Sequence, residues 1–216
     1  MNHCPLCESV DTQFFWEKVD RRFGRREYWE CNNCFLAYLL AECRLNSIFE
    51  KSKYDEHNNS AEDKGYVDFL NRLIIPMSKC LLKGLEGLDF GSGPGPTSCI
   101  LFKALGFEVK NYDPYYCKDP EVLNQKFDFI SCSEVVEHFY NPKKEFELMF
   151  SLLKEKGLLG IMTSFRDPKK DFSKWWYHID PTHVCFYQKE TFAYIAKKMN
   201  AALDLSNKNV ALFKKT

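Results

Sequence analysis

One short segment constrains this chain more than any other, because in it an apolar run ends in a carboxylate and three glycines follow at alternate positions. The segment reads Leu88-Asp89-Phe90-Gly91-Ser92-Gly93-Pro94-Gly95. Glycine has no side chain to hold the backbone away from a ligand, and it accepts the positive φ angles that a tight turn between strand and helix needs. We therefore expect a β-strand, a glycine loop and a helix in this order, with the main chain of the loop against a nucleotide-like cofactor.

A second acidic residue stands where such a cofactor needs one. Asp113 ends the next short apolar run, residues 107–112, about twenty residues after the glycines. In a doubly wound sheet, an acidic group at this position accepts hydrogen bonds from the ribose hydroxyls of a nucleotide. The sequence thus predicts two separate contacts for one cofactor.

The charge of this region separates the two cofactor classes that use the arrangement, dinucleotides and S-adenosylmethionine. The dinucleotide fingerprint wants glycine or alanine where this chain has Pro96, and Asp89 would repel a diphosphate. S-adenosylmethionine is cationic, and unit charges about 4 Å apart interact by on the order of 4 kcal/mol at an effective dielectric constant of about 20. Glu134 and Glu137 add carboxylates after the next expected strand, residues 127–132. The acidic edge favours the cation, and a nicotinamide-dependent oxidoreductase is the last alternative.

These features together resemble the class I S-adenosylmethionine-dependent methyltransferases, and among them the group with a Cys-rich zinc module at the N-terminus. The resemblance rests on residues 88–95, Tyr112-Asp113-Pro114, residues 127–138 and Lys156-Gly157-Leu158-Leu159-Gly160, which together span most of residues 86–165. It implies that Asp113 binds the ribose hydroxyls of the cofactor. It also implies that the methionine end is held by Asp89, Gly91, Gly93 and Gly95, and that Ser133 and Glu134 lie beside the cofactor. The chain departs from the family after Asp113, because about thirteen residues before Phe127 are too few for the usual helix, strand and second acidic loop.

Four cysteines near the N-terminus are spaced as metal ligands. Cys4-Pro5-Leu6-Cys7 and Cys31-Asn32-Asn33-Cys34 are two C-x-x-C pairs with twenty-three residues between them. Each pair presents two thiolates from a tight knuckle, and the four sulfurs complete the tetrahedral shell of a structural zinc with no position left for catalysis. Aromatic runs on either side of the polar residues 20–26 predict a hairpin, so we expect a zinc ribbon over residues 1–40. Disulfides or a redox pair are the alternatives.

Composition and charge limit the partners of the chain. Its 216 residues are 45% apolar, enough for one substantial core and a small appendage. Thirty basic and thirty acidic residues cancel, so no overall field attracts nucleic acid or anionic lipid. No apolar run approaches about eighteen residues, and residues 1–5 lack the pattern of a signal sequence. We therefore expect no membrane contact, a cytoplasmic location and cysteines that are reduced or metal-bound.

The expected hairpin turn carries the feature that favours a nucleic-acid partner. Arginines crowd this turn, at positions Arg21, Arg22, Arg25 and Arg26. Exposed arginines are usually a solvated face, but four of them on a zinc ribbon can also bind RNA phosphates.

Hydrophobic periodicity alternates between strands and helices, which predicts an α/β fold with a Rossmann-like, doubly wound and mostly parallel sheet. We divide the chain into the zinc ribbon (1–40), a helical linker or lid (41–85) and an S-adenosylmethionine-binding methyltransferase domain (86–216). The other expected elements are a helix from Ser60 and Asp63 that kinks or restarts at Pro76, a helix over 96–105, a helix from Asn141-Pro142 to Gly157, a strand over 158–163, a helix over 190–199, and a final hairpin of 203–205 with 210–213.

The methyl acceptor has no motif of its own, but the resemblance implies that residues 175–187 border its pocket. An in-line displacement first requires that the nucleophile be placed, and a positioned base then helps. His183 is the first candidate for a base or acceptor-orienting group, and His138 is the second. Histidines that hydrogen-bond to hold a turn are the alternative for both. Tyr54 and His57 are candidates to close over the site from the N-terminal side.

The sequence as a whole favours an S-adenosylmethionine-dependent methyltransferase with structural zinc, acting on a small molecule or a carrier-tethered acceptor. An RNA methyltransferase that docks through its ribbon is the alternative among enzymes. A binding or scaffold module that keeps the cofactor fold without catalysis is the alternative from another class.

Overall fold

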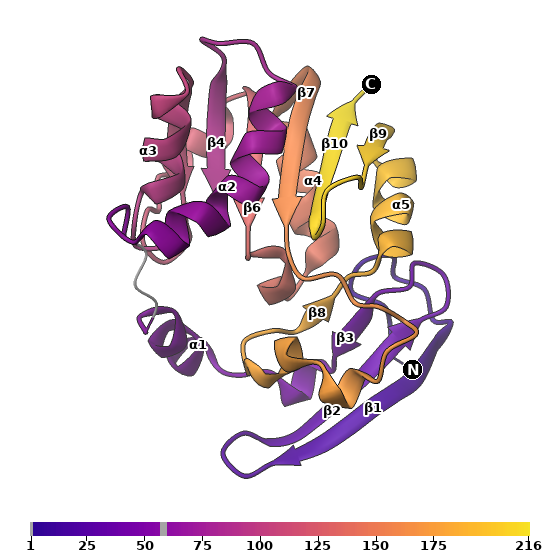
Figure 1. The fold of residues 1–216 in the computed structure, drawn as a ribbon. Helices are drawn as coiled ribbons and strands as arrows, with labels where there is room; N and C mark the ends of the chain where they lie inside the picture. Colours follow the sequence, from indigo (N-terminus) through magenta and orange to yellow (C-terminus); the bar gives the residue numbers. More distant parts are fainter. Residues whose placement is uncertain (1, 57–59) are drawn as a thin grey trace.

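A six-stranded sheet lies at the centre of the molecule in a computed structural model that describes residues 2–56 and 60–216. The strand order is β5-β4-β6-β7-β10-β9 (Figure 1). The bounds are β4 (Glu86–Phe90), β5 (Glu108–Tyr112), β6 (Phe127–Ser133), β7 (Leu153–Met162), β9 (Ala201–Asp204) and β10 (Val210–Lys215). The first four strands in this order run parallel, whereas β10 is antiparallel to both of its neighbours. The expected Rossmann-like, mostly parallel sheet is therefore confirmed.

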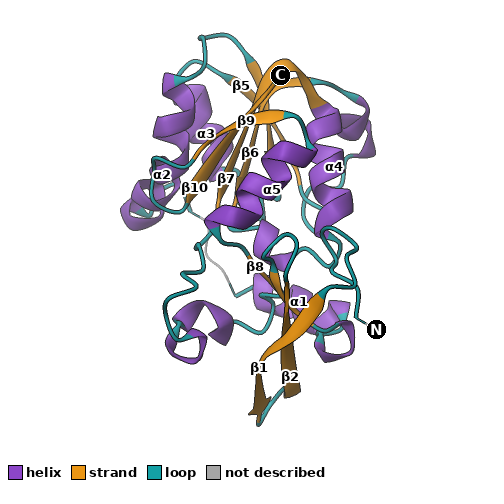
Figure 2. Ribbon diagram, turned by 90° about the vertical axis from the view of Figure 1, so that its right-hand side faces the viewer, coloured by secondary structure: helices purple, strands orange, loops and turns teal. Residues whose placement is uncertain are grey.

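Helices cover both faces of this sheet, as Figure 2 shows. They are α2 (Lys64–Lys79), α3 (Thr97–Ala104), α4 (Pro142–Leu152) and α5 (Lys189–Lys198). One apolar cluster lies under α2 and α3, and a larger one lies under α4 and α5. Side chains alternate between the two faces of a strand. In β6, for example, Phe129 belongs to the first cluster and Ile130 to the second.

The start of α2 differs from the sequence-based expectation. The helix begins after Asp63, whose carboxylate accepts the Gly65 N–H at 2.8 Å, so Ser60 lies outside it. The helix also continues through Pro76 without a break, so the expected restart does not occur. Buried residues on both sides of the proline, Ile74 and Met77, pack this helix onto the sheet and keep it continuous.

The end of α4 differs as well, although its start is the expected one. Pro142 is the first helical residue, and the Asn141 side chain accepts the Lys144 N–H as the cap. The helix ends at Leu152 because Leu153 is buried and opens β7 by pairing with Phe127 of β6. Tertiary pairing therefore shortens this helix and lengthens the strand that follows.

The connection after β5 is short and contains no strand. Residues 113–126, all of which the structure describes, hold a tight turn closed by the Asp113–Cys117 bridge and a 3₁₀ helix over Pro120–Asn124. The sheet consequently ends at β5. This agrees with the shortage of residues between Asp113 and Phe127.

A second, four-stranded antiparallel sheet packs beneath the first. It joins β1 (Thr12–Asp20), β2 (Gly24–Cys31), β3 (Ala37–Leu39) and β8 (Cys185–Phe186) in that order. The expected hairpin is present, with Asp20 opposite Gly24 beside the turn. Its last strand comes from the far end of the chain, because Phe186 pairs with Ala37. The division at residues 40 and 85 stays a prediction.

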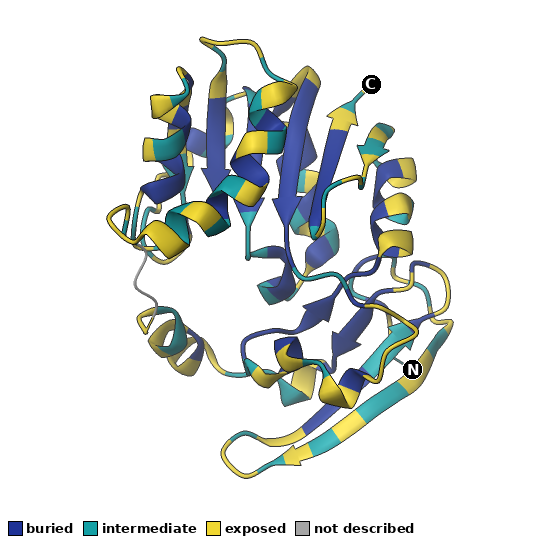
Figure 3. Cartoon of the chain, in the orientation of Figure 1, coloured by how far each residue is buried: buried dark blue, intermediate teal, exposed yellow. Residues whose placement is uncertain are grey.

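The larger apolar cluster runs without interruption from the small sheet into the large one. It includes Tyr28 and Leu39 from the small sheet and Leu159 and Phe213 from the large one, all fully buried. Figure 3 shows the contrast between these buried strands and the more exposed β1. Among the described residues, no helix has the length and apolar character needed to cross a membrane.

Close packing of α2 on β7 yields a first prediction. A Cβ added to Gly160 would lie 2.2 Å from the sulfur of Met77. We expect Gly160→Ala to lower the free energy of unfolding by about 1–3 kcal/mol, as overpacking does, in urea titrations. In the Gly160→Ala/Met77→Ala double variant the added methyl fills part of the vacated space. The double variant should therefore lose less stability than the two single variants together, and strict additivity would contradict the packing argument.

Candidate functional site

The carboxyl ends of three parallel strands meet at one edge of the large sheet. Asp89, near the end of β4, lies opposite Asn111 of β5 and Ser131 of β6. This edge faces the small sheet and helix α1 (Ser47–Tyr54), as Figure 1 shows. Loops that follow adjacent parallel strands lie side by side, so the motifs predicted from separate stretches of sequence come together here.

The glycine loop leaves β4 in a conformation that other residues rarely adopt. Gly91 and Gly93 have φ angles of 79° and 65°. A Cβ on Gly91 would lie 2.5 Å from a methyl carbon of Val135, and the Gly91 N–H donates to the Tyr112 carbonyl at 2.8 Å. Gly95 follows in the same loop, before α3. The loop is therefore held against the connections that follow both β5 and β6.

Asp89 is a buried carboxylate at this edge. Its side chain is 3% exposed and accepts a hydrogen bond from the Ser131 hydroxyl at 2.9 Å. Burial raises its pKa to about 6, and the hydrogen bond from Ser131 offsets part of that rise. A cation placed nearby would stabilise the ionised form.

Asp113 ties the loop after β5 to the glycine loop. Its Oδ2 accepts the Gly93 N–H at 2.9 Å, and its Oδ1 accepts the N–H groups of Tyr115 at 2.8 Å and Tyr116 at 3.1 Å. An ionised carboxylate has about four acceptor positions, so these three contacts leave capacity for a ligand hydroxyl. The carboxylate thus orders both loops before any ligand arrives.

The loop after β6 carries the next two expected residues. Ser133 ends the strand, and its buried hydroxyl has no hydrogen-bond partner among the described residues. Glu134 has a φ of 53° and donates its backbone N–H to the Met162 carbonyl at 2.8 Å. Burial raises the pKa of Glu134 to about 7, and the Tyr177 hydroxyl lies 3.1 Å from its Oε2.

A buried polar network surrounds Tyr177 and was not predicted as a site. Its hydroxyl lies 2.5 Å from Glu137 Oε1 and 2.9 Å from Thr163 Oγ1, while Thr163 also donates to Glu137 Oε2 at 2.9 Å. Glu137 is fully buried, and burial together with the neighbouring Glu134 raises its pKa to about 7. The Glu-x-x-Glu-His spacing of residues 134–138 was the available signal for Glu137. Tyr177 and Thr163 have no such signal in the sequence, because only the tertiary structure brings them to Glu137.

Both candidate histidines lie beside this network and beside each other. The centres of the His138 and His183 rings are 4.8 Å apart. His138 Nδ1 contacts the Thr182 carbonyl at 3.1 Å, and His183 Nδ1 contacts the Tyr177 carbonyl at 2.6 Å. Because a carbonyl only accepts, each Nδ1 carries the proton, and in the neutral ring the lone pair lies on Nε2. Each ring is therefore held at Nδ1 by a backbone carbonyl, with its lone pair on Nε2.

Helix α1 bridges the loops after β5 and β6. The Tyr54 ring lies 5.2 Å from the His138 ring and 5.6 Å from the Tyr115 ring. Glu50 accepts hydrogen bonds from the Tyr54 hydroxyl at 2.8 Å and the Tyr115 hydroxyl at 3.0 Å. Tyr54 therefore contacts His138 and Tyr115, its closure over the site stays a prediction, and His57 lies outside the described residues.

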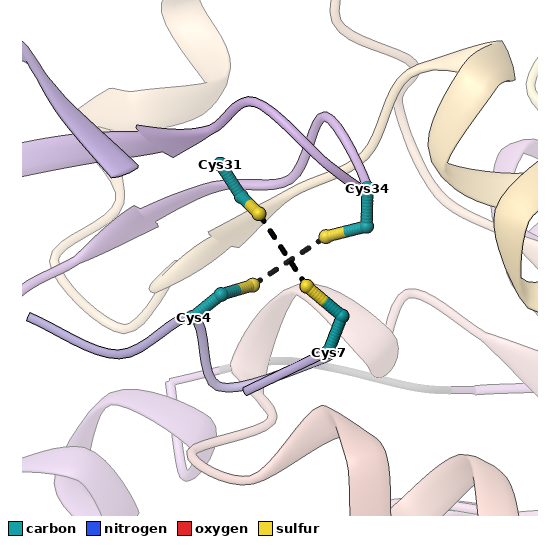
Figure 4. A group of neighbouring side chains, drawn as sticks. All are labelled: Cys4, Cys7, Cys31 and Cys34. Carbon is teal, nitrogen blue, oxygen red and sulfur yellow. Dashed lines mark hydrogen bonds between the residues drawn. The ribbon is translucent and has the colours of Figure 1, made fainter. Parts of the chain in front are cut away.

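The four N-terminal cysteines converge on one point (Figure 4). Their sulfur atoms lie within 4.8 Å of one another, with Cys4 to Cys34 and Cys7 to Cys31 both at 3.4 Å. These distances exclude disulfide bonds, and all four thiols are free. Four sulfurs at about 2.3 Å from a tetrahedral zinc would be about 3.8 Å apart, so the set fits that ion.

The arginines of the hairpin turn are only partly available to a partner. Arg26 is buried and donates to the Pro181 carbonyl at 2.8 Å. An exposed arginine patch, which the sequence suggested, therefore does not include it. Arg25 pairs with Glu17 at 3.1 Å. Arg21 and Arg22 are exposed. Of the four arginines, only Arg26 is lost from the surface, and Arg25 stays exposed beside its carboxylate partner.

Comparisons with known proteins agree with this geometry. A model of the methyltransferase domain family matches residues 54–205, more than half of the chain. No curated protein matches the sequence.

Several solved structures share the fold. The 1,6-didemethyltoxoflavin-N1-methyltransferase of Burkholderia thailandensis, with 1,6-didemethyltoxoflavin and S-adenosylhomocysteine bound, has a TM-score of 0.59 and 11% identity over 94% of this chain and 99% of its own. A SAM-dependent methyltransferase of Archaeoglobus fulgidus has a TM-score of 0.56 and 20% identity over 79% of this chain and 100% of its own. Magnesium protoporphyrin IX methyltransferase of Synechocystis PCC 6803, with S-adenosylhomocysteine bound, has a TM-score of 0.50 and 13% identity over 78% and 94%. At these identities the likeness shows the fold alone.

The buried Asp89 carboxylate leads to a prediction about pH. Its pKa is about 6 in the folded protein and about 4 in an unfolded chain, so the folded state binds the proton more tightly. The stability contribution is fully present below pH 4 and is lost as pH rises through 6, by up to about 3 kcal/mol. The difference in unfolding free energy between the ligand-free protein and Asp89→Asn should change over this window. Asp68→Asn, at an exposed position, should show the same dependence of unfolding free energy on pH as the wild type. If Asp89→Asn also showed the wild-type dependence on pH, the raised pKa of Asp89 would be contradicted.

Proposed function

The chain belongs to the methyltransferase domain family and is a class I S-adenosylmethionine-dependent enzyme, and we propose that it methylates a small-molecule or carrier-tethered acceptor. The observation that carries the proposal is the hydrogen bond from the Gly93 N–H to Asp113, which joins the two loops expected to hold the donor. Donor and acceptor would meet where these loops adjoin the histidines after β6 and before β8. The reaction forms a bond from acceptor to methyl carbon, breaks the sulfonium bond and releases S-adenosylhomocysteine.

The donor side is assigned as follows. Asp89, Gly91, Gly93 and Gly95 hold the methionine end, Asp113 binds the ribose hydroxyls, and Ser133 and Glu134 lie beside the donor. Burial of Asp89 and Asp113 supports a cationic ligand, because removal from water strengthens the attraction of a carboxylate to a sulfonium or ammonium group. The unpartnered Ser133 hydroxyl supports a polar contact at the same edge.

The acceptor side is assigned to His183 and His138, which orient the acceptor or accept its proton. Their Nδ1 atoms donate to backbone carbonyls, which supports a fixed ring orientation with the lone pair on Nε2. Holding two reactants in attack geometry can lower a barrier by roughly 7–11 kcal/mol, and a positioned base typically adds about 10²–10⁴-fold. Placement by these rings is therefore the larger effect.

Two methyltransferases of this fold with bound S-adenosylhomocysteine are named for small-molecule acceptors, 1,6-didemethyltoxoflavin and magnesium protoporphyrin IX. On the ribbon Arg26 is buried and Arg25 is paired with Glu17, so two of the four arginines are less available to RNA phosphates. Both observations support a small acceptor over RNA.

Donor binding can be tested by calorimetry. The wild-type protein should bind S-adenosylhomocysteine and give no heat with NAD. Asp113→Ala should weaken binding by about 10- to 100-fold, the size of a lost hydrogen bond to a charged group. Asp119→Ala removes an exposed aspartate from the same connection and should bind as the wild type does. Absence of binding to the wild type, or equal binding by folded Asp113→Ala, would overturn the donor assignment.

Acceptor class can be tested by incubating the protein with a methyl-labelled donor and separated metabolite, protein and RNA pools. Label in the metabolite pool is the expected result. Label in RNA would replace the proposal with the RNA alternative. Tight cofactor binding with no label in any pool would indicate a scaffold without catalysis.

We further propose that the four N-terminal cysteines bind one structural zinc. Zinc binding to such segments is worth roughly 10–16 kcal/mol at neutral pH, enough to fold a unit with a small core of its own. Four thiolates complete the coordination, so this ion takes no part in methyl transfer.

Chelation should unfold residues 1–40 first, with a change in the near-ultraviolet circular dichroism because Trp16 and Trp29 lie in the hairpin. Cys31→Ser should lose the ion, so that zinc content falls from about one equivalent per chain. Cys80→Ser changes an exposed cysteine outside the cluster and should keep the zinc. An unchanged spectrum after zinc removal would argue against the ribbon assignment.

A further inference from the structure

A second group of possible metal ligands lies at the acceptor side of the candidate site. One carboxylate oxygen of Glu137 and one ring nitrogen each from His138 and His183 lie within 4.8 Å of one another. The first two residues belong to the 3₁₀ turn Val136–His138 that follows β6. His183 comes from the segment just before β8, and the Val184 N–H donates to the Glu137 carbonyl at 2.8 Å. Backbone pairing therefore holds the two halves of the group together.

Each member of the group is oriented by a second hydrogen bond. Both histidines direct Nδ1 to a backbone carbonyl, which leaves Nε2 as the atom with the lone pair. Glu137 is held by the hydroxyls of Tyr177 and Thr163. Histidine ligands of metals almost always donate their other ring N–H in this way, and ligating carboxylates are themselves hydrogen-bonded. The arrangement has the outer shell of a metal site as well as its ligands.

The negative charge of two neighbouring carboxylates also favours a bound cation. Glu134 and Glu137 both contact the single hydroxyl of Tyr177, so two carboxylates share one buried region. Among the described residues, no lysine or arginine forms an ion pair with either of them, and Arg72 attracts Glu134 only from a longer distance. A divalent cation on Glu137 would reduce their mutual repulsion.

We propose that Glu137, His138 and His183 bind a divalent transition-metal cation, and that this cation binds and orients a hydroxyl oxygen of the methyl acceptor. Two imidazoles and a carboxylate suit such ions, and three protein ligands leave coordination positions open for substrate. The ribbon cysteines, by contrast, form a closed four-sulfur set. The role in methyl transfer rests on the proposed function, whereas the binding of the cation does not.

The position beside the glycine loop makes this role specific. Val135, which precedes the 3₁₀ turn, packs against the glycine loop, so that a Cβ added to Gly91 would lie 2.5 Å from a Val135 methyl carbon. An oxygen bound to the cation would thus be close to the loop assigned to the donor. The cation would lower the pKa of the acceptor hydroxyl, whose proton passes to water, and the oxygen would then form the bond to the methyl carbon as the sulfonium bond breaks. The acceptor class is therefore a hydroxyl compound, and the product is a methyl ether.

The test is a cobalt titration of the zinc-loaded protein, followed by visible absorbance. Cobalt bound to nitrogen and oxygen gives weak visible bands without the intense near-ultraviolet bands of a cobalt–thiolate bond, so the two metal sites are distinguished. The wild-type protein should saturate with these weak bands. Glu137→Gln and His183→Gln should each weaken cobalt binding by at least about tenfold.

Two histidines outside the group serve as matched controls. His3→Gln changes an exposed histidine, and His178→Gln changes a buried one. Both should bind cobalt as the wild type does. Folding of every variant is checked by circular dichroism, and His138→Gln replaces Glu137→Gln if that variant does not fold. Absence of the weak bands in the wild type, or their persistence in the folded ligand variants, would overturn the proposal.

Calorimetry with S-adenosylhomocysteine on the same samples separates this proposal from the proposed function. Variants that bind S-adenosylhomocysteine but not cobalt support the cation site. A wild-type protein that binds S-adenosylhomocysteine without cobalt contradicts the cation site alone. A wild-type protein that binds cobalt without S-adenosylhomocysteine supports the cation site and contradicts the donor assignment.

Discussion

Parallel pairing of β4 with its two neighbours is the constraint on which the site depends. With Asn111 and Ser131 opposite Asp89, three loops that are distant in sequence must leave the sheet at the same edge. Carboxylates on those loops then gather where an isolated carboxylate would be costly to bury. Their charges are offset by backbone N–H groups, hydroxyls and, in our proposals, cationic ligands. The same pairing that builds the core thus also creates the electrostatic character of the site.

The small sheet takes part in the site through one strand. β3 pairs with β8, and the segment that carries His183 is thereby held against the turn that carries Glu137 and His138. Buried Arg26 adds a further tie through the Pro181 carbonyl. The N-terminal unit is therefore a support for the acceptor side as well as a cysteine cluster. Its physical link to the chemistry is the backbone pairing of β3.

Local patterns in the sequence predicted the parts of the structure that depend on local interactions. The glycine loop, the Asn141-Pro142 helix start and the hairpin were found because turn geometry and capping act over a few residues. The predicted end of α4 and the predicted start of α2 were wrong. Strand pairing by Leu153 ends α4, and the cap at Asp63 sets the start of α2. The RNA-binding hypothesis weakened for a similar reason. Exposure of Arg26 depends on what packs over it.

The sequence by itself determined the order of strands and helices, the glycine loop with its acidic partners and the four-cysteine spacing, since each is written within a short stretch of residues. Only the tertiary structure decided that β8 joins the small sheet, that Tyr177 links Glu134 to Glu137, and that two histidines forty-five positions apart become neighbours. These contacts join residues through the packing of separate elements. Periodicity and spacing along the chain do not predict which loops the folded core brings together.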